Sequence, residues 1–283
     1  MLEDVQNRPD VRQLPIDEVG ITGIRYPVAV WDREHGKQDT IAQVSMSVDL
    51  RSTVKGAHLS RFVEVLHAFA GELSPRTLPI ILQTLQQRLG SSRARFDADF
   101  PYFLHRAAPV TGSSALMDYQ CHLSGHSEGS STDLTVAVRV PVTSVCPCSK
   151  AISDYGAHNQ RGHITIHVCP RSEDDGQAAM VWIEELIEIA EASASSPVYP
   201  LLKRPDERHV TMSAHDHPMF VEDMVRAAAR ALSHDDRIVR FSVEAANDES
   251  IHNHAAFARI DSRHLPGSQP SDSPVPLAVG SGQ

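Results

Sequence analysis

The chain has 283 residues, four cysteines, sixteen histidines and a formal net charge of −10 at pH 7. That length allows one large domain or two of ordinary size, the acidic balance excludes a nucleic-acid-binding protein with a broad basic surface, and four cysteines are too few for a disulfide scaffold. Because the first residues lack a basic and apolar leader and no apolar run is long enough to span a bilayer, we expect a cytoplasmic protein without membrane contacts.

The first half of the chain reads as strands, then helices, then strands. Residues 1–20 are polar with scattered prolines, and we expect them to form an arm outside the fold. After an opening strand over 21–30, the segment from Ala42 alternates apolar and polar residues and predicts a half-buried strand. Apolar residues at helical spacing then predict helices over 60–73 and 78–89, the second ending at Gly90. Two further strands are expected over 93–105 and 114–126.

The same order of elements recurs in the second half. Strands are expected from Asp133 and His163, helices over 179–192 and 219–232, and strands from Ile238 and Asn253. Helices grouped between strands favour an α+β fold with antiparallel sheets over a parallel doubly wound fold. We therefore predict two tandem modules, over 21–128 and 129–263, each with its helices on one face of its sheet. Residues 264–283 are rich in proline, serine and glycine, and we expect a disordered tail there.

Cysteine and histidine meet where the strand from Asp133 ends. This stretch reads SVCPCSKAISDYGAHNQRGH, and Pro147 removes a hydrogen-bond donor from the strand, which predicts an exit loop. Cys146, Cys148 and His158 fit a metal of the zinc type, a nucleophile with its base, or a structural loop. Spacing leaves these alternatives open, because two cysteines and one histidine make neither a CxxC pair nor a complete tetrahedral site.

Carboxylates occur in three later polar segments. LLKRPDERHV places Glu207 in a predicted polar loop, where it could supply a missing metal ligand. Glu222 lies in the first turn of the helix over 219–232, where an acidic residue is also favoured simply by the helix dipole. ESIHNH brings Glu249, His252 and His254 to a connection between two strands. These three residues are either ordinary surface groups or a set for acid–base chemistry.

Four motifs together carry a family resemblance. TSVCPCSKAISDYGAHNQRGH, LLKRPDE, PMFVEDMVR and NDESIHNHAAFA, in this order and spacing, closely resemble the type IB GTP cyclohydrolases over nearly everything between the two ends. The resemblance implies a bimodular tunnelling fold and a homotetramer whose active sites lie between subunits. It also implies hydrolysis of GTP to 7,8-dihydroneopterin triphosphate and formate, the entry step of tetrahydrofolate biosynthesis.

The resemblance also implies residue roles. Cys146, His158 and Glu207 would hold one divalent transition metal per active site, zinc, manganese or iron, with a position open for water. Proton transfers would fall to Glu249, His252 and His254, beside Cys146 among the catalytic residues. Glu222 would bind the N1 and N2 edge of guanine. The candidates for the triphosphate, where charged donors bind strongly, are Lys203, Arg204, Arg161, Lys55, His58 and Arg61.

Two departures and two rivals qualify this interpretation. Met212 and His215 stand where the family has an acid and an aromatic residue, which bears on the pocket wall rather than on the ligands. A nitrile reductase of the 7-deazaguanine pathway, with a cysteine nucleophile and NADPH, is the nearest rival, but LLKRPDE and ESIHNH favour the cyclohydrolase. A non-catalytic protein with a structural metal loop is the other rival; it predicts that losing Cys146 costs folding rather than turnover.

Overall fold

The chain folds into two compact units. A computed structural model describes residues 4, 6, 8–129, 131–174 and 176–265. Unit 1 comprises Met1–Phe100, His122–Val136 and Ser172–Met180, and unit 2 comprises Pro101–Cys121, Ala137–Arg171 and Val181–Gln283. Three long strands, β3 (Arg93–Ala107), β4 (Ser114–Glu128) and β5 (Ser131–Val145), contribute residues to both units. The module boundary at residue 129 stays a prediction.

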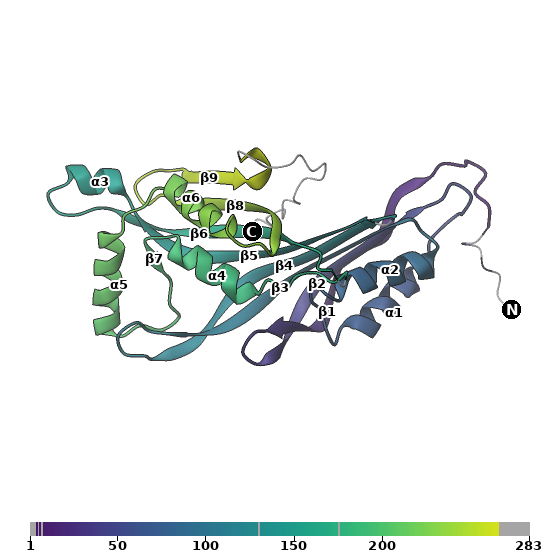
Figure 1. Ribbon diagram of the computed structural model, residues 1–283, viewed down its shortest axis with the longest axis horizontal. Helices are drawn as coiled ribbons and strands as arrows, with labels where there is room; N and C mark the ends of the chain where they lie inside the picture. Colours follow the sequence, from purple (N-terminus) through teal and green to yellow (C-terminus); the bar gives the residue numbers. More distant parts are fainter. Residues whose placement is uncertain (1–3, 5, 7, 130, 175, 266–283) are drawn as a thin grey trace. The chain divides into compact units, whose positions relative to one another are not determined.

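Unit 1 is an antiparallel sheet covered by two helices (Figure 1). Strands β1 (Ile16–Asp32) and β2 (Gly36–Leu50) pair with each other, and β2 pairs with β3. The predicted alternation in β2 is confirmed, since Val44, Met46 and Val48 are buried. Helices α1 (Leu59–Phe69) and α2 (Leu78–Leu89) bury their apolar stripes, and α2 ends at Gly90 in a left-handed conformation, φ 67°, that favours glycine.

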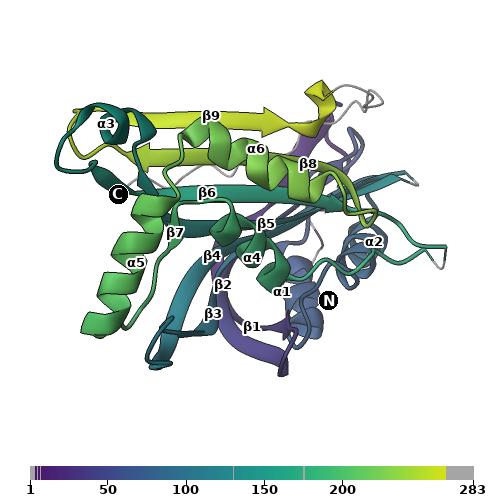
Figure 2. The ribbon, with the colours of Figure 1, turned by 60° about the vertical axis from the view of Figure 1, so that its left-hand side comes forward.

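Unit 2 repeats this plan. In it, β5, β6 (Asn159–Pro170), β8 (Ile238–Asp248) and β9 (Ala255–Asp261) follow one another across the sheet, and the short β7 (Ser196–Pro197) pairs with β5. Helices α4 (Ile183–Ala192) and α6 (Val221–Leu232) lie along the same sheet, whereas α5 (Arg204–Asp216) stands at its end (Figure 2). The short elements are α3 (Pro147–Ile152) and the 3-10 turn Ser262–His264. The predicted α+β class, with antiparallel sheets and helices on one face, is confirmed.

Several predicted boundaries differ from the structure. The segment around Glu207, predicted as a loop, is the 13-residue helix α5. Its apolar stripe is too thin to reveal a helix, because only Asp206 and Ala214 among its residues are buried. The helix predicted over 179–192 begins at Ile183, and β1 begins at Ile16, inside the predicted arm. Residues 266–283, most of the tail expected to be disordered, lie outside the described residues.

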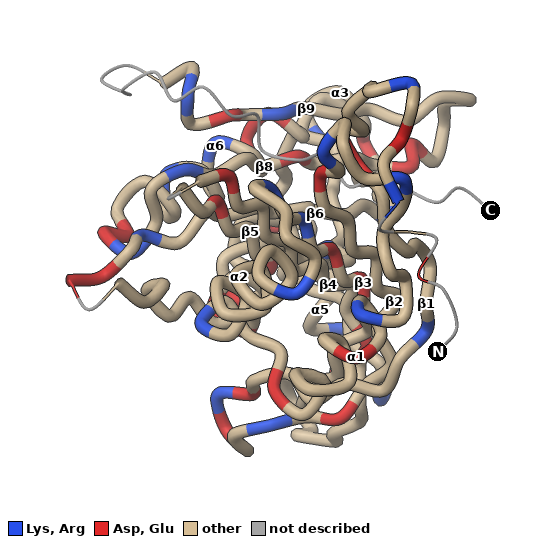
Figure 3. The backbone as a smooth tube through the Cα atoms, turned by 90° about the vertical axis from the view of Figure 1, so that its right-hand side faces the viewer, with Lys and Arg blue, Asp and Glu red and all other residues tan. Residues whose placement is uncertain are grey.

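The distribution of charged residues and the apolarity of the helices agree with what the composition indicates. Acidic and basic residues are interspersed along the described chain (Figure 3). Within the ranges that the structure describes, we find no helix with the length and apolarity needed to cross a membrane.

Candidate active site

The predicted metal-binding cysteine begins a short helix at the exit of β5. Cys146 is the N-cap of α3, and its sulfur accepts a hydrogen bond from the backbone N–H of Ser149, with an N···S distance of 3.5 Å. The backbone N–H of Cys146 donates to the carbonyl oxygen of His158 at 3.1 Å. This bond ties the cysteine to the histidine across the α3 connection. Cys148 lies within α3 and is exposed, and both cysteines carry free thiols.

His158 is held through one side of its ring. Its Nδ1 lies 2.9 Å from Oε1 of Gln160 and 3.4 Å from the hydroxyl oxygen of Ser250. Its Nε2 makes no hydrogen bond to any described residue, and is therefore the ring nitrogen available to a ligand.

Glu207 and two predicted phosphate-binding residues gather at the start of α5. Lys203 is the N-cap, and Arg204 and Glu207 lie in the first turn, all three exposed to solvent. Asp206 between them is completely buried. Sequence reasoning missed Asp206, although a carboxylate three residues after an N-cap and a proline at the helix start are recognised start signals.

Asp206 fixes this end of α5 to the connection between β3 and β4. Its carboxylate accepts backbone hydrogen bonds from Val110, Thr111 and Lys203, each at 2.9 Å, and one from the Thr111 hydroxyl at 2.7 Å. Burial opposes ionisation, but these donors outweigh it, so the pKa of Asp206 lies well below its ordinary value. The start of α5 is therefore anchored by an ionised, fully paired carboxylate.

The predicted purine-binding residue is exposed on the first turn of α6. Its neighbour Asp223 supplies the helix cap, since the Asp223 carboxylate accepts the N–H of Phe220 at 3.2 Å. Glu222 makes no hydrogen bond or ion pair with any other described residue. Capping therefore does not occupy Glu222, and its carboxylate is available to a ligand.

The predicted acid–base set lies between β8 and β9, as expected. The rings of His252 and His254 stack with centroids 5.0 Å apart and an interplanar angle of 15°. Oε1 of Glu249 lies 3.4 Å from Nε2 of Gln160, and Oε1 of the same Gln160 side chain contacts His158. The structure thus brings Glu249 into the neighbourhood of His158 through one shared partner.

One chain does not bring the three predicted metal ligands together. Over the residues that the structure describes, no three His, Cys, Asp or Glu side chains lie close enough to hold a metal ion. The side-chain ammonium of Lys150, in α3, donates to the carbonyl oxygen of His215, at the far end of α5. Glu207 lies eight residues before His215, about 12 Å away along a helix. Cys146 and His158 fit a zinc-type ion as donors, but α5 does not deliver Glu207 to them.

The other triphosphate candidates are scattered. Arg161 is exposed on β6 in unit 2, whereas the remaining three belong to unit 1. There, Arg61 donates to the carbonyl oxygen of Arg88 at 2.6 Å, and His58 lies 3.3 Å from the carboxylate of Asp4. Lys55 bonds through its backbone N–H to the carbonyl oxygen of Arg8. The departures Met212 and His215 both lie on α5.

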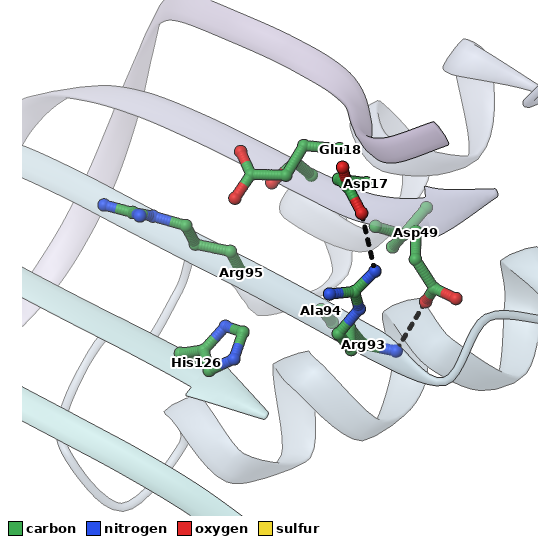
Figure 4. A pocket seen from close by; sticks show the side chains of 9 residues that line it. Asp17, Glu18, Asp49, Arg93, Ala94, Arg95 and His126 are labelled. Carbon is green, nitrogen blue, oxygen red and sulfur yellow. Dashed lines mark hydrogen bonds and ion pairs between the residues drawn. The ribbon is translucent and has the colours of Figure 1, made fainter. Parts of the chain in front are cut away.

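A small pocket in unit 1 does not coincide with these residues. It measures about 80 Å³, and its lining residues contact one another, among them Arg93 to Asp17 at 3.3 Å and the N–H of Arg93 to Asp49 at 2.6 Å (Figure 4). Drug-sized ligands fill pockets of roughly 300 Å³ or more. A nucleotide therefore does not fit inside it.

Comparisons with known proteins cover nearly the whole chain. Residues 2–258 match the family model of "Type I GTP cyclohydrolase folE2". GTP cyclohydrolase FolE2 of Magnetococcus marinus is 50% identical over 260 residues, covering 92% of this chain and 96% of that protein. GTP cyclohydrolase FolE2 of Methylococcus capsulatus is 50% identical over 260 residues, covering 92% and 94%.

A solved structure supports the fold. Uricase from Arthrobacter globiformis is similar with a TM-score of 0.51 at 9% identity, covering 90% of this chain and 96% of that one. At this identity the likeness concerns the fold alone; it confirms the predicted tunnelling fold and is consistent with its tandem modules.

Proposed function

Because the chain belongs to the type I GTP cyclohydrolase family of the FolE2 kind, we propose that its second unit carries the catalytic groups of that reaction. The chain is a GTP cyclohydrolase, which converts GTP and water to 7,8-dihydroneopterin triphosphate and formate at the entry to folate synthesis. One observation carries this function: the family match over residues 2–258 includes every predicted site residue. The family assignment displaces the nitrile reductase and the non-catalytic protein as interpretations.

The metal site that we propose combines Cys146 and His158 of one subunit with Glu207 of another. The backbone bond between Cys146 and His158 supports the first half of this proposal. The position of Glu207 supports the second half, because Glu207 lies at the start of α5 and the contact with α3 is made by the other end of that helix. When bound, a divalent ion supplies an activated water for attack on C8 of guanine. Zinc, manganese and iron all suit the sulfur, nitrogen and oxygen donors.

The remaining residues bind the substrate and move protons. The free carboxylate of Glu222 accepts two hydrogen bonds from N1–H and the N2 amino group of guanine, a donor pair that adenine lacks. Opening of the imidazole ring and release of formate both require proton transfer, which we assign to Glu249, His252 and His254. Exposed cationic side chains at the start of α5 and on β6, namely Lys203, Arg204 and Arg161, bind triphosphate oxygens.

We propose that the protein carries out these roles as a homotetramer in the cytoplasm. A ligand set divided between subunits makes the isolated chain inactive, so activity and assembly are coupled. Free thiols on Cys146 and Cys148 agree with a reducing compartment.

Incubation with GTP tests the function. Protein freed of metal and reconstituted in turn with zinc, manganese or iron is given GTP, and formate and the fluorescent oxidised pterin are measured. We expect both products in a one-to-one ratio with at least one of the metals. Unchanged GTP with all three metals contradicts the proposed function.

A further inference from the structure

Buried polar side chains cross three neighbouring strands of unit 2 beside His158. Gln160 on β6, Ser144 on β5 and Asn247 on β8 are 6%, 0% and 2% exposed. The Ser144 hydroxyl oxygen accepts from Nε2 of Gln160 at 2.7 Å and from Nδ2 of Asn247 at 2.8 Å. Buried polar groups persist in proteins where they are paired, and the two hydrogen bonds to Ser144 hold this set inside the sheet, although Oδ1 of Asn247 has no hydrogen-bond partner among the described residues.

The partners of Gln160 fix which way its amide points. Its Nε2 lies 2.7 Å from the Ser144 hydroxyl oxygen and 3.4 Å from Oε1 of Glu249, and its Oε1 lies 2.9 Å from Nδ1 of His158. Oε1 of Glu249 accepts from Nε2 of Gln160, so the NH₂ group of the amide faces Glu249. The amide oxygen then faces His158, and an oxygen acceptor requires the proton to be on Nδ1. The lone pair of this imidazole is therefore on Nε2.

Backbone register holds the arrangement in place. Strands β6 and β8 pair with Gly162 opposite Asn247, and Glu249 follows directly after the last residue of β8, Asp248. A Cβ atom at position 162 would lie 2.0 Å from Oδ1 of Asn247, so glycine is required there to make room for the Asn247 amide. Gln160 is thus a buried residue of a paired strand and not a flexible surface side chain.

We propose that Gln160 is a positioning residue, which locks His158 in the Nδ1–H tautomer so that Nε2 faces the divalent ion, and which holds Glu249 beside the same imidazole. The proposal rests on the proposed function for the roles of His158 and Glu249. Imidazole ligands in proteins usually donate their second N–H to a fixed acceptor, and loss of that acceptor weakens metal binding about 10- to 100-fold. Gln160 links the metal-binding and proton-transfer groups through a single side chain.

The tautomer is measured first, in protein without metal. Histidine labelled with a nitrogen isotope reports by NMR which ring nitrogen carries the proton, above the pH range in which imidazole titrates, and His158→Gln assigns the signal. We expect Nδ1–H in the wild type and a shift of population toward Nε2–H in Gln160→Met. An unchanged tautomer in Gln160→Met overturns the proposal.

Metal affinity is measured next, by competition for zinc with a chromophoric chelator. Gln160→Met should bind zinc about 10- to 100-fold more weakly. Gln160→Glu should bind zinc as the wild type does, because a carboxylate also accepts from Nδ1–H, but its turnover should fall because it repels Glu249. Gln120→Met, an exposed glutamine on β4, is the matched control and should change neither quantity. Wild-type affinity in Gln160→Met, or wild-type turnover in Gln160→Glu, contradicts the proposal.

The two measurements separate this inference from the proposed function. If the wild type neither binds zinc nor releases formate, the proposed function fails, while the tautomer in the metal-free protein still decides the role of Gln160. If Gln160→Met does not fold, the isosteric Gln160→Glu decides the matter. A His158 ring that loses its Nδ1–H tautomer in Gln160→Glu overturns the inference.

Discussion

The backbone N–H of Cys146 donates to the carbonyl oxygen of His158 at 3.1 Å. This bond does not involve either side chain, so it holds the two backbones together without occupying the thiol or the imidazole. Side chains at these two positions can therefore be exchanged without breaking the connection between them.

Loss of the Cys146 thiol should abolish turnover and leave the fold intact. Serine is a good N-cap, so Cys146→Ser should keep α3 and change the free energy of unfolding by no more than about 1 kcal/mol. Formate release and urea unfolding are measured on the same preparation, with Cys148→Ser as the active control. An unfolded Cys146→Ser protein would instead support a structural role for this thiol.

Mixing of two inactive variants tests whether the metal ligands come from different subunits. Cys146→Ser and Glu207→Gln should each be inactive alone. After joint refolding, mixed oligomers should regain part of the wild-type turnover, because some sites then receive Cys146 from one subunit and Glu207 from another. A mixture as inactive as its components contradicts the divided site and places all ligands in one chain.

Replacement of Glu222 should remove GTP binding without removing the metal. Glu222→Gln turns one acceptor oxygen of the carboxylate into a donor that faces the guanine edge, which should weaken GTP binding by at least tenfold, about 1.4 kcal/mol. Asp223→Asn is the matched control, since it alters the helix cap of α6 and not the purine site. Equilibrium binding of GTP and metal content are measured for both. Loss of the metal in Glu222→Gln would place this residue among the ligands instead.

Asp206 should make the anchoring of α5 depend on pH. Its pKa is lowered in the folded protein, so its contribution to stability is fully present above the unfolded value of about 3.9 and is lost as the pH falls through the lower folded value. Asp206→Asn should lower the midpoint of thermal unfolding by several degrees at neutral pH, and the difference from the wild type should shrink in acid. A difference that stays constant down to acidic pH contradicts this account.

The local patterns in the sequence were sufficient for most of the fold. The alternation in β2 and the stop at Gly90 depend only on neighbouring residues, and both are confirmed. The helix α5 could not be predicted in this way. It is anchored by hydrogen bonds that the Asp206 carboxylate accepts from the backbone of Val110 and Thr111, which lie 96 and 95 residues away in the chain.

The site was predicted less completely than the fold. The tie between Cys146 and His158 and the separation of Glu207 from them both depend on the path of the chain in space. The sequence does contain a signal for Gln160, because this polar residue shares a strand face with the buried Ile164 and Ile166. A polar residue on an apolar strand face indicates a specific partner.

The fate of the C8 atom of GTP tests most directly the central claim, that the protein is a GTP cyclohydrolase. GTP isotopically labelled at C8 is incubated with the metal-reconstituted protein, and the label is followed by NMR. The account predicts that the label leaves the purine and appears as formate, and that Cys146→Ser leaves it in GTP. Label that stays in the purine ring while the wild-type protein consumes GTP would contradict the account.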